Sequence, residues 1–444
     1  MDDHTEPPTT PAAAPRLVEL SSADAGRIKT FEETVWFEHT PGMSVEQWVE
    51  GFDYTAGKGV EVDASPPPGA PAGESRPLVG LYGAFDMQLT VPGPGAGLSR
   101  VPLSGLSWVG VHPDHRRRGI LRSMMTDHLH GLHDTGRAAV AGLWAAEVGI
   151  YGRYGYAASA LEVTLELGRG AELTIPPAIR EGAAEVSTHL VPAASDEAAA
   201  VRHTVHQSAT SATLGSVTRT EELGRVYYRD VPKARGTKEP RQMLLAQDAA
   251  GPAGYAVLRR TSDWDDRSNP QGKLDVVEVA AADPVVLAAL ALRLLDMDLI
   301  GKVKIRGRST EDPLVWWAGG PRTAACTVTD GLWLRLVDLP RALAERGYAS
   351  EVDLVLEVTD DFCPWNAGRW RFAVDAAGIG SCEPSDAEAD LVLPVQVLAA
   401  AYAGGRSVAA QAAAGAVTEV RPGTAVTLSR AMRGDVEPFG AIGF

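Results

Sequence analysis

The stretch VGVHPDHRRRGILRSMM, residues 109–125, joins a predicted strand that ends at Val111 to a helical pattern that begins at Ile120. The backbone N–H groups at the start of such a helix have no partners within it, and the helix dipole adds positive charge there. Gly119 lets the chain approach a phosphate closely. The cationic side chains of the stretch are Arg116, Arg117, Arg118 and Arg122. The turn therefore predicts an anion-binding site, with a solvated basic face on an ordinary helix as the alternative.

The composition limits the partners of the chain. Its 444 residues predict two or three domains, and its formal net charge is −16. This acidic balance argues against nucleic acid as a partner, because binding to a phosphate backbone needs a basic face. Neutral or cationic partners fit better. The three cysteines show neither metal-ligand nor redox spacing, which suits a reducing compartment and a cytoplasmic protein.

Two segments have a composition that bears on targeting and membrane insertion. Residues 1–15 are acidic and proline-rich without an apolar core, so they predict a disordered tail rather than a signal peptide or an anchor. The longest apolar stretch, residues 285–300, is interrupted by Arg293, Asp296 and Asp298. We therefore expect no membrane-spanning helix and no membrane partner.

Three consecutive parts follow the tail. Residues 16–172 alternate strand and helix patterns and predict a mixed α/β unit. Residues 173–328 repeat this order, with Asp283 placed to cap a helix and Pro284 at its first position, but without the glycine and the arginine run. Residues 329–444 predict an α+β unit that ends in alanine-rich helices. The pattern indicates a duplicated α/β fold whose second copy is degenerate, followed by a different domain.

Two motifs resemble the GNAT superfamily of N-acetyltransferases. The turn matches Arg/Gln-x-x-Gly-x-Gly/Ala, the acetyl-CoA loop of that superfamily, with Arg116 first and Gly119 in the middle. Leu121 departs from the small third residue of the motif. GNAT enzymes also carry Tyr-x-x-x-Gly-Phe/Tyr after the next strand, and IYGRYGY, residues 150–156, supplies it with Tyr151 as the tyrosine. The resemblance implies that the turn binds the pyrophosphate of acetyl-CoA.

Longer segments resemble the enhanced intracellular survival protein (Eis) family within this superfamily. They are GLSWVGVHPDHRRRGILRSM, AEVGIYGRYGY and DGLWLRLVDLPRALAERGY, together with the length and a final phenylalanine. The resemblance implies tandem GNAT domains, of which the second lacks the acetyl-CoA loop, followed by a domain of sterol carrier protein fold. It also implies a homo-hexamer that acetylates amines, notably of aminoglycosides, and that can acetylate lysine side chains.

The family resemblance also implies the roles of individual residues. The backbone of Val109 and Val111 pairs with the pantetheine arm, and the phenol of Tyr151 is the general acid. The main-chain carboxylate of Phe444 is the general base. A terminal carboxylate has an ordinary pKa of about 3.3 to 3.7 and can accept a proton at neutral pH, whereas a tyrosine, near about 10, can donate one. The residues expected to bind acetyl-CoA are Val109, Gly110, Val111, Arg116, Arg117, Arg118, Gly119, Ile120, Leu121, Arg122, Ala146 and Glu147.

The acceptor site departs from the family pattern. Trp144 and Ala146 stand where Eis-type chains commonly have His and Ser, and Gly443 stands where the residue before the last phenylalanine is often acidic. Fewer polar groups are therefore expected in the acceptor pocket, which leaves the identity of the amine open. An aromatic wall with one carboxylate is expected from the predicted helix near residue 36, with packing of the helix in the core as the alternative. Its residues are Trp36, Phe37 and Glu38.

A histidine cluster in DHLHGLHD, residues 127–134, suggests a metal site. Residues two apart on a helix point about 200° apart, so only His130 and His133 can converge. Two ligands are too few for zinc. We therefore expect no metal.

The leading interpretation is an acetyl-CoA-dependent N-acetyltransferase that acts on a primary amine of a small cationic molecule, with aminoglycosides as a candidate class. One alternative is a protein or peptide lysine N-acetyltransferase, which needs an open acceptor groove. Another is a non-catalytic ligand carrier that uses the C-terminal domain and needs a large apolar cavity there.

Overall fold

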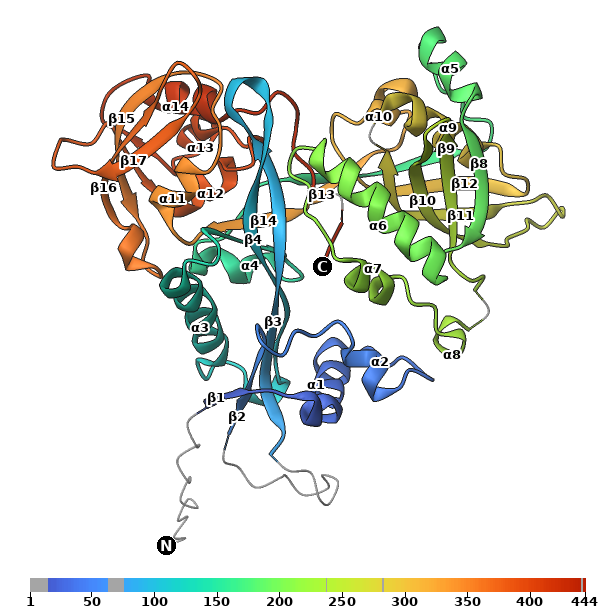
Figure 1. Ribbon diagram of the computed structural model, residues 1–444, viewed down its shortest axis with the longest axis horizontal. Helices are drawn as coiled ribbons and strands as arrows, with labels where there is room; N and C mark the ends of the chain where they lie inside the picture. The colour runs from blue at the N-terminus through green and yellow to red at the C-terminus, as the bar shows by residue number, and fades with distance from the viewer. Residues whose placement is uncertain (1–14, 63–75, 237, 282, 441) are drawn as a thin grey trace, which may run out of the picture. The chain divides into compact units, whose positions relative to one another are not determined.

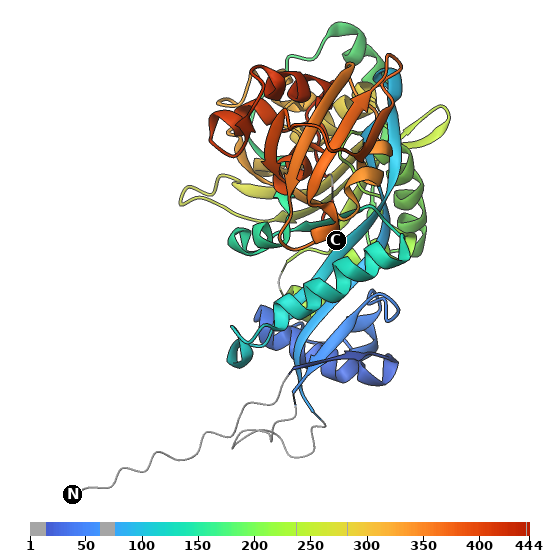
Figure 2. The ribbon, with the colours of Figure 1, turned by 90° about the vertical axis from the view of Figure 1, so that its left-hand side faces the viewer.

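Strand β4 (Leu98–Val111) and helix α3 (Ile120–Thr135) flank the arginine-rich turn, as the sequence predicts (Figure 1). They belong to a computed structural model, shown from two sides in Figure 1 and Figure 2. The structure describes residues 15–62, 76–236, 238–281, 283–440 and 442–444. Of the tail predicted over residues 1–15, all but Pro15 lies outside the described residues.

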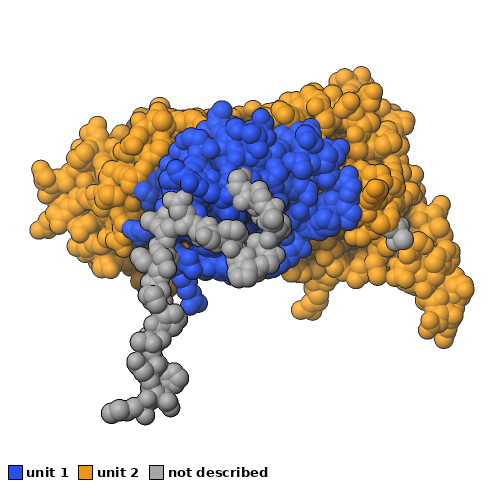
Figure 3. Space-filling view, turned by 90° about the horizontal axis from the view of Figure 1, so that it is seen from below, with its two compact units in different colours: residues 1–85, 106–128 blue, residues 86–105, 129–444 orange. Residues whose placement is uncertain are grey.

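Figure 3 distinguishes two compact units. The first comprises residues 1–85 and 106–128, and the second residues 86–105 and 129–444. Strands β3 (Leu78–Pro92) and β4 and helix α3 continue from one unit into the other.

The first unit combines an antiparallel sheet with two helices. Strand β1 pairs with β2, and β2 pairs with the beginning of β3. Apolar residues at helical spacing, Ile28 and Phe31, form one buried cluster with Leu78 and Leu81 of β3. The amphipathic helix α1 therefore packs its apolar face on the sheet. The bounds are β1 Arg16–Glu19, α1 Ala25–Trp36, α2 Val45–Val49 and β2 Lys58–Glu61.

In the second unit, β5 extends the first sheet. Residues Leu103–Gly105 of β4 pair in parallel with Val140–Gly142 of β5. Strand β14 pairs with the other edge of β5 in the antiparallel direction, and β6 pairs with β14. The helix α4 follows β5 and carries the predicted tyrosine motif. The bounds are β5 Val140–Trp144, α4 Val148–Tyr151, β6 Ala157–Ala158 and β14 Leu332–Leu336.

The second sheet has the strand order β13-β7-β12-β11-β10-β9-β8. Successive residues of β10 belong to two different hydrophobic clusters. Tyr255 and Val257 pack with residues of α6. Ala256 and Leu258 pack with residues of α9. The two helices therefore cover opposite faces, and Figure 1 shows α6 in front of β10 and β11. The strands are β7 Leu161–Gly168, β8 Ser187–Pro192, β9 Gln242–Asp248, β10 Gly251–Thr261, β11 Gly272–Ala281, β12 Ile300–Arg308 and β13 Thr327–Asp330. The helices are α5 Pro177–Ala184, α6 Asp196–Ser211, α7 Glu221–Tyr227, α8 Pro232–Arg235, α9 Pro284–Leu295 and α10 Pro313–Trp317.

The third sheet has the order β17-β16-β15-β18-β19 and is drawn in orange to red in Figure 2. Leu356, Phe372, Leu398 and Tyr402 are fully buried in this part of the chain. The strands are β15 Val352–Thr359, β16 Gly368–Val374, β17 Gly380–Pro384, β18 Leu391–Pro394 and β19 Thr418–Glu419, and the helices are α11 Leu339–Ala344, α12 Val395–Ala401, α13 Val408–Ala413 and α14 Thr424–Met432. Among all helices that the structure describes, none has the length and apolarity needed to cross a bilayer.

Two strands lie in sheets other than those that the sequence suggests. Strand β7 falls in the predicted part 16–172 but lies in the second sheet, between β13 and β12. Strand β14 falls in the predicted part 329–444 but lies in the first sheet, between β5 and β6. An alternating apolar pattern indicates a strand but not its neighbours, which long-range packing selects. The sheets therefore do not follow the three continuous ranges.

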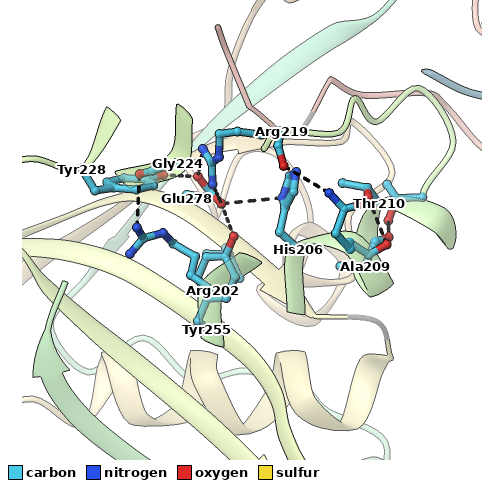
Figure 4. A network of polar contacts seen from close by, with 12 residues as sticks. Arg202, His206, Ala209, Thr210, Arg219, Gly224, Tyr228, Tyr255 and Glu278 are labelled. Atoms are coloured by element: carbon cyan, nitrogen blue, oxygen red, sulfur yellow. Dashed lines mark hydrogen bonds and ion pairs between the residues drawn. The ribbon is translucent and has the colours of Figure 1, made fainter. Parts of the chain in front are cut away.

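A buried ionic network lies between α6 and the second sheet (Figure 4). The carboxylate of Glu278 accepts hydrogen bonds from the guanidinium of Arg219 at 3.0 and 3.1 Å and from the hydroxyls of Tyr228 and Tyr255. Burial alone would raise the pKa of Glu278, but the charge of Arg219 and these hydrogen bonds hold it at about 2. His206 lies 4.0 Å from the same carboxylate, and burial lowers the pKa of this imidazole to about 4.

The network predicts a loss of stability in acid. The reference pKa values are 4.5 for Glu278 and 6.5 for His206, so both groups have a lower pKa when folded. The native state then binds fewer protons than the unfolded chain. The stability that these two groups contribute is complete above about pH 6.5. The contribution of His206 is lost as the pH falls through 4, and that of Glu278 as the pH falls through 2.

We expect His206→Gln to remove the part of this loss that lies between about pH 6.5 and pH 4, on the order of 3 kcal/mol. The measurement is the free energy of unfolding in urea as a function of pH. His189→Gln, at an exposed position on β8, is the control and should keep the wild-type slope. An acid dependence in His206→Gln equal to that of the wild type would contradict this account of the network.

Candidate active site

The arginine-rich turn forms an open cradle at the start of α3. Its backbone has a φ of +62° at Arg117 and +79° at Gly119, a region that glycine adopts without strain. No atom lies within 4 Å of the position that a Cβ on Gly119 would occupy. The side chains of Arg116, Arg117, Arg118 and Arg122 are exposed. Together with the first N–H groups of a 16-residue helix, these donors fit an anionic group such as a pyrophosphate.

The strand that leads into the turn has an irregular backbone. Trp108 has a φ of +57°, which interrupts the regular pleat just before Val109–Val111. A Cβ on Gly110 would lie 2.9 Å from Val35 and 3.0 Å from Phe31, so glycine allows β4 to pack closely on α1. The sequence analysis predicts that Gly110 binds acetyl-CoA, and the structure adds this packing reason for a glycine. Beyond the turn, the Ile120 side chain is buried and that of Leu121 is half-buried, so Ile120 can serve a ligand only through its backbone.

Tyr151 ends helix α4 and its side chain is buried, with 8% exposed. Its ring lies 6.0 Å from that of Tyr156, edge to face. Burial raises the pKa of Tyr151 to about 12, and the negative charge of Glu147 acts in the same direction. The phenol is therefore protonated at neutral pH and can donate a proton. Ala146 and Glu147, which precede α4, are exposed.

Phe444 lies in a slot beside the end of β5. Its ring meets the indole of Trp144 edge to face, with 5.0 Å between the ring centres. A Cβ on Gly105 would lie 2.7 Å from the Phe444 ring and 2.7 Å from the sulfur of Met87. Glycine at position 105 therefore leaves the space that the ring fills. Sequence reasoning missed Gly105 and Met87, although a glycine inside a strand is a general sign of such a close approach.

The segment before Phe444 is held by backbone hydrogen bonds. The N–H of Phe439 donates to the carbonyl oxygen of Leu214 at 3.0 Å, and the N–H of Glu437 donates to a carboxylate oxygen of Glu311 at 2.8 Å. The hydroxyl of Ser309 donates to the carbonyl oxygen of Glu437 at 3.2 Å. The path of the chain toward the Phe444 slot is thus fixed in the second unit.

Family models match three parts of the chain. Acetyltransferase (GNAT) domains match residues 72–159 and 215–336, and a sterol carrier protein domain matches residues 339–440. An uncharacterised N-acetyltransferase of Streptomyces coelicolor is 36% identical over 84% of this chain and 87% of that protein. The N-acetyltransferase Eis of Mycobacterium bovis is 32% identical over 77% of this chain and 80% of that protein. The chain belongs to the Eis family.

Solved structures share the fold of this chain. The crystal structure of Eis1 from Mycobacterium abscessus covers 97% of this chain and 100% of that chain, with a TM-score of 0.76 and 27% identity. A GCN5-related N-acetyltransferase from Kribbella flavida shares the fold, with a TM-score of 0.73 and coverage of 97% and 99%. This Eis-family chain is therefore an N-acetyltransferase with two GNAT domains and a C-terminal sterol carrier protein domain.

The predicted acceptor residues of this Eis-family enzyme lie at the end of α1. Trp36 is 40% exposed and Phe37, with a φ of +55°, is 83% exposed. Glu38 is also exposed. The alternative, that the Trp36 and Phe37 rings pack in the core, is therefore wrong, because both rings are exposed at the end of α1. The adjacent Glu32 is buried, and burial raises its pKa to about 8, a feature that sequence reasoning missed.

The second GNAT domain of this Eis-family chain has a different turn. Residues 112–119 separate strand and helix in the first domain, whereas only residues 282–283 separate β11 from α9. The carboxylate of Asp283 already accepts hydrogen bonds from the N–H groups of Val285 and Val286, at 2.7 and 3.0 Å. The helix start is thus occupied by the predicted cap, and a negative charge stands where an anion would have to bind.

The histidines of α3 have aromatic partners. His133 stacks on Trp365 at 4.1 Å between ring centres, and His130 meets the same indole edge to face at 4.8 Å. No group of three or more metal-ligating side chains is found among the described residues. His130 and His133 do lie on the same side of α3, as their spacing predicts, and both contact the indole of Trp365.

Proposed function

We propose that this Eis-family enzyme transfers the acetyl group of acetyl-CoA to a primary amine of a small cationic molecule, the chemical class to which aminoglycosides belong. The observation that carries the proposal is the combination of an exposed arginine cradle at a helix start with a buried, protonated tyrosine. The first suits a pyrophosphate, and the second suits a thiolate leaving group.

Acetyl-CoA would be held by the turn and the strand before it. The N–H groups at the start of α3 and the guanidinium groups would bind its pyrophosphate, and the open space at Gly119 supports this. The backbone of Val109 and Val111, next to the irregularity at Trp108, would pair with the amide groups of the pantetheine arm. The further proposed contacts are Gly110, Arg116, Arg117, Arg118, Ile120, Leu121, Arg122, Ala146 and Glu147.

Two groups would move protons in the reaction. As the nitrogen–carbon bond forms, the main-chain carboxylate of Phe444 would accept a proton from the amine. As the carbon–sulfur bond breaks, the phenol of Tyr151 would give its proton to the sulfur. The pKa of about 12 keeps Tyr151 protonated at neutral pH, as the second role requires, and the fixed slot of the Phe444 ring supports the first role.

The preference for a cationic acceptor rests on nearby carboxylates. Glu162 accepts a hydrogen bond from the indole N–H of Trp144 at 3.0 Å, and Trp144 in turn contacts the Phe444 ring. Burial raises the pKa of Glu162, and the negative charge of Asp330 raises it further. An ammonium group that comes close to Glu162 and Asp330 would favour the charged form of Glu162 and pair with it, in keeping with the net charge of −16. Trp36, Phe37 and Glu38 are proposed to line the acceptor side in the first unit.

A panel of amines tests the proposed function. Release of free thiol from acetyl-CoA is followed with aminoglycosides, simple diamines, lysine-containing peptides and a neutral sugar. Thiol release that is stimulated most by the small cationic amines supports the proposal. Greater stimulation by the peptides would favour the lysine acetyltransferase alternative, and release with no amine would contradict both.

Gly119→Val tests the cradle. A valine at a φ of +79° is strained, and its side chain projects into the space proposed for a phosphate. We expect the Kd for acetyl-CoA, measured by titration calorimetry, to rise at least about tenfold, or about 1.4 kcal/mol. Gly131→Val, an open position on the same helix, should leave the Kd unchanged. An unchanged Kd in Gly119→Val would contradict the cradle.

A further inference from the structure

The Tyr151 turn, residues 148–156, is in direct contact with the sterol carrier protein domain. The side-chain amide of Gln396, on α12, donates a hydrogen bond to the carbonyl oxygen of Gly152 at 2.8 Å. The ring of Tyr154 meets that of Phe362, which follows β15, edge to face at 4.8 Å. The residue after Tyr151 and the ring of Tyr154 are therefore both fixed by a part of the chain more than 200 residues away.

A fully buried ion pair lies against the same turn. The Nη2 atom of Arg335, on β14, donates to both carboxylate oxygens of Asp360, at 2.8 and 2.6 Å. Asp360 also accepts hydrogen bonds from the N–H of Cys363 and from the side-chain amide of Asn366, each at 3.0 Å. The guanidinium is thus attached to a carboxylate that the third domain holds on several sides.

The guanidinium packs directly on the turn. A Cβ on Gly155 would lie 2.5 Å from both Cζ and Nη1 of Arg335, so the backbone of the turn and the guanidinium are in close contact. Gly155, with a φ of +85°, is the glycine of the tyrosine motif. Its lack of a side chain is needed both for this conformation and for this contact.

The ion pair of Arg335 and Asp360 does not have the features of a strongly stabilising contact. Two nitrogen atoms of the Arg335 guanidinium, Nε and Nη1, are buried and have no hydrogen-bond partner among the described residues. Replacing a buried ion pair by apolar residues is often neutral or stabilising, so the pair is weak evidence for a stabilising role. What it fixes here is the distance between Gly155 and Asp360.

We propose that the sterol carrier protein domain positions the hydroxyl of Tyr151, and that Gln396 and Arg335 are the positioning residues through which it acts. This inference rests on the proposed role of Tyr151 as the proton donor. It gives the sterol carrier protein domain a part in catalysis in addition to that proposed for Phe444, and this part needs no lipid ligand. A small displacement of the turn would lower kcat, because proton transfer needs heavy atoms within about 2.6 to 3.2 Å.

Gln396→Ala tests the proposal with little risk to the fold. The substitution removes the hydrogen bond to Gly152 and leaves no charge unpaired. We expect kcat to fall about 3- to 30-fold, while the Kd for acetyl-CoA and the melting temperature stay near wild type. Gln411→Ala is the matched control, because Gln411 donates a similar hydrogen bond to Val397 within its own domain. A kcat for Gln396→Ala equal to that of the control would overturn the proposal.

A double-variant cycle separates positioning from a general effect on the fold. If Gln396 acts through Tyr151, Gln396→Ala has no further effect on the residual rate of Tyr151→Phe. An equal loss of kcat in both backgrounds would overturn the proposal and leave the role of Tyr151 intact. Full activity of Tyr151→Phe alone would instead remove the proton donor on which the proposal rests.

Arg335→Lys provides a second, independent variant. It keeps the positive charge beside Asp360 but removes the planar group that contacts Gly155. We expect a fall in kcat at least as large as that of Gln396→Ala, with the Kd for acetyl-CoA unchanged. A folded Arg335→Lys enzyme with the wild-type kcat would contradict the proposed contact.

Discussion

Replacing Tyr151 with phenylalanine should lower kcat by about 10² to 10⁴ while the Kd for acetyl-CoA changes little. The substitution removes one hydroxyl from a side chain that is 8% exposed, so the packing of the turn is retained. The measurement combines steady-state kinetics with calorimetric titration of acetyl-CoA. Because the pKa of Tyr151 is about 12, the wild-type kcat should show no loss from its ionisation below about pH 11.

Tyr156→Phe is the control for that variant. Tyr156 is fully buried in the same motif, and its hydroxyl has no hydrogen-bond partner among the described residues. Removing this hydroxyl should leave kcat close to wild type. If the two variants had equal activity, water or the substrate would supply the proton, and the assignment of Tyr151 would be wrong.

The second large effect is expected at Phe444. Deleting it, or adding a residue after it, should abolish transfer while folding and acetyl-CoA binding survive. One extra residue moves the terminal charge by more than about 3 Å, which would take the proposed base out of hydrogen-bond reach of the amine. The deletion also empties the slot formed by Gly105 and Trp144.

Intact-mass analysis of the native protein accompanies this test, since the role requires that Phe444 carry the terminal carboxylate. The same peptide tag at the N-terminus is the control for tagging itself and should be tolerated. Normal turnover of the C-terminally extended enzyme would contradict the role of Phe444 as the base.

Local features of the fold follow from the sequence. The start of α3 after Gly119 and the cap of α9 by Asp283 depend on neighbouring residues, and the structure confirms both. The locations of β7 and β14 depend on partners far along the chain. Apolar alternation identifies these strands but carries no information about which edge they join.

The candidate site also has some features that the sequence predicts and others that depend on long-range packing. Tyr151 and the arginines lie in short motifs whose spacing can be recognised in the sequence. The slot for Phe444 and the contact between Gly155 and Arg335 form only when distant segments pack together. Gly105 and Gly155 are the sequence features that could have indicated these contacts, because a glycine within or beside regular structure often marks a close approach of another group. The sequence does not identify the group that approaches.

The most direct test of the central claim is single-turnover acetyl transfer by a protein whose terminal carboxylate is converted to a carboxamide. This change removes one negative charge and leaves the Phe444 ring and its slot in place. The account predicts that the carboxamide protein binds acetyl-CoA with the wild-type Kd, and that amine-dependent thiol release, present in the unmodified enzyme, is nearly lost. Equal rates of release from the two proteins, or no amine-dependent release from the unmodified one, would contradict it.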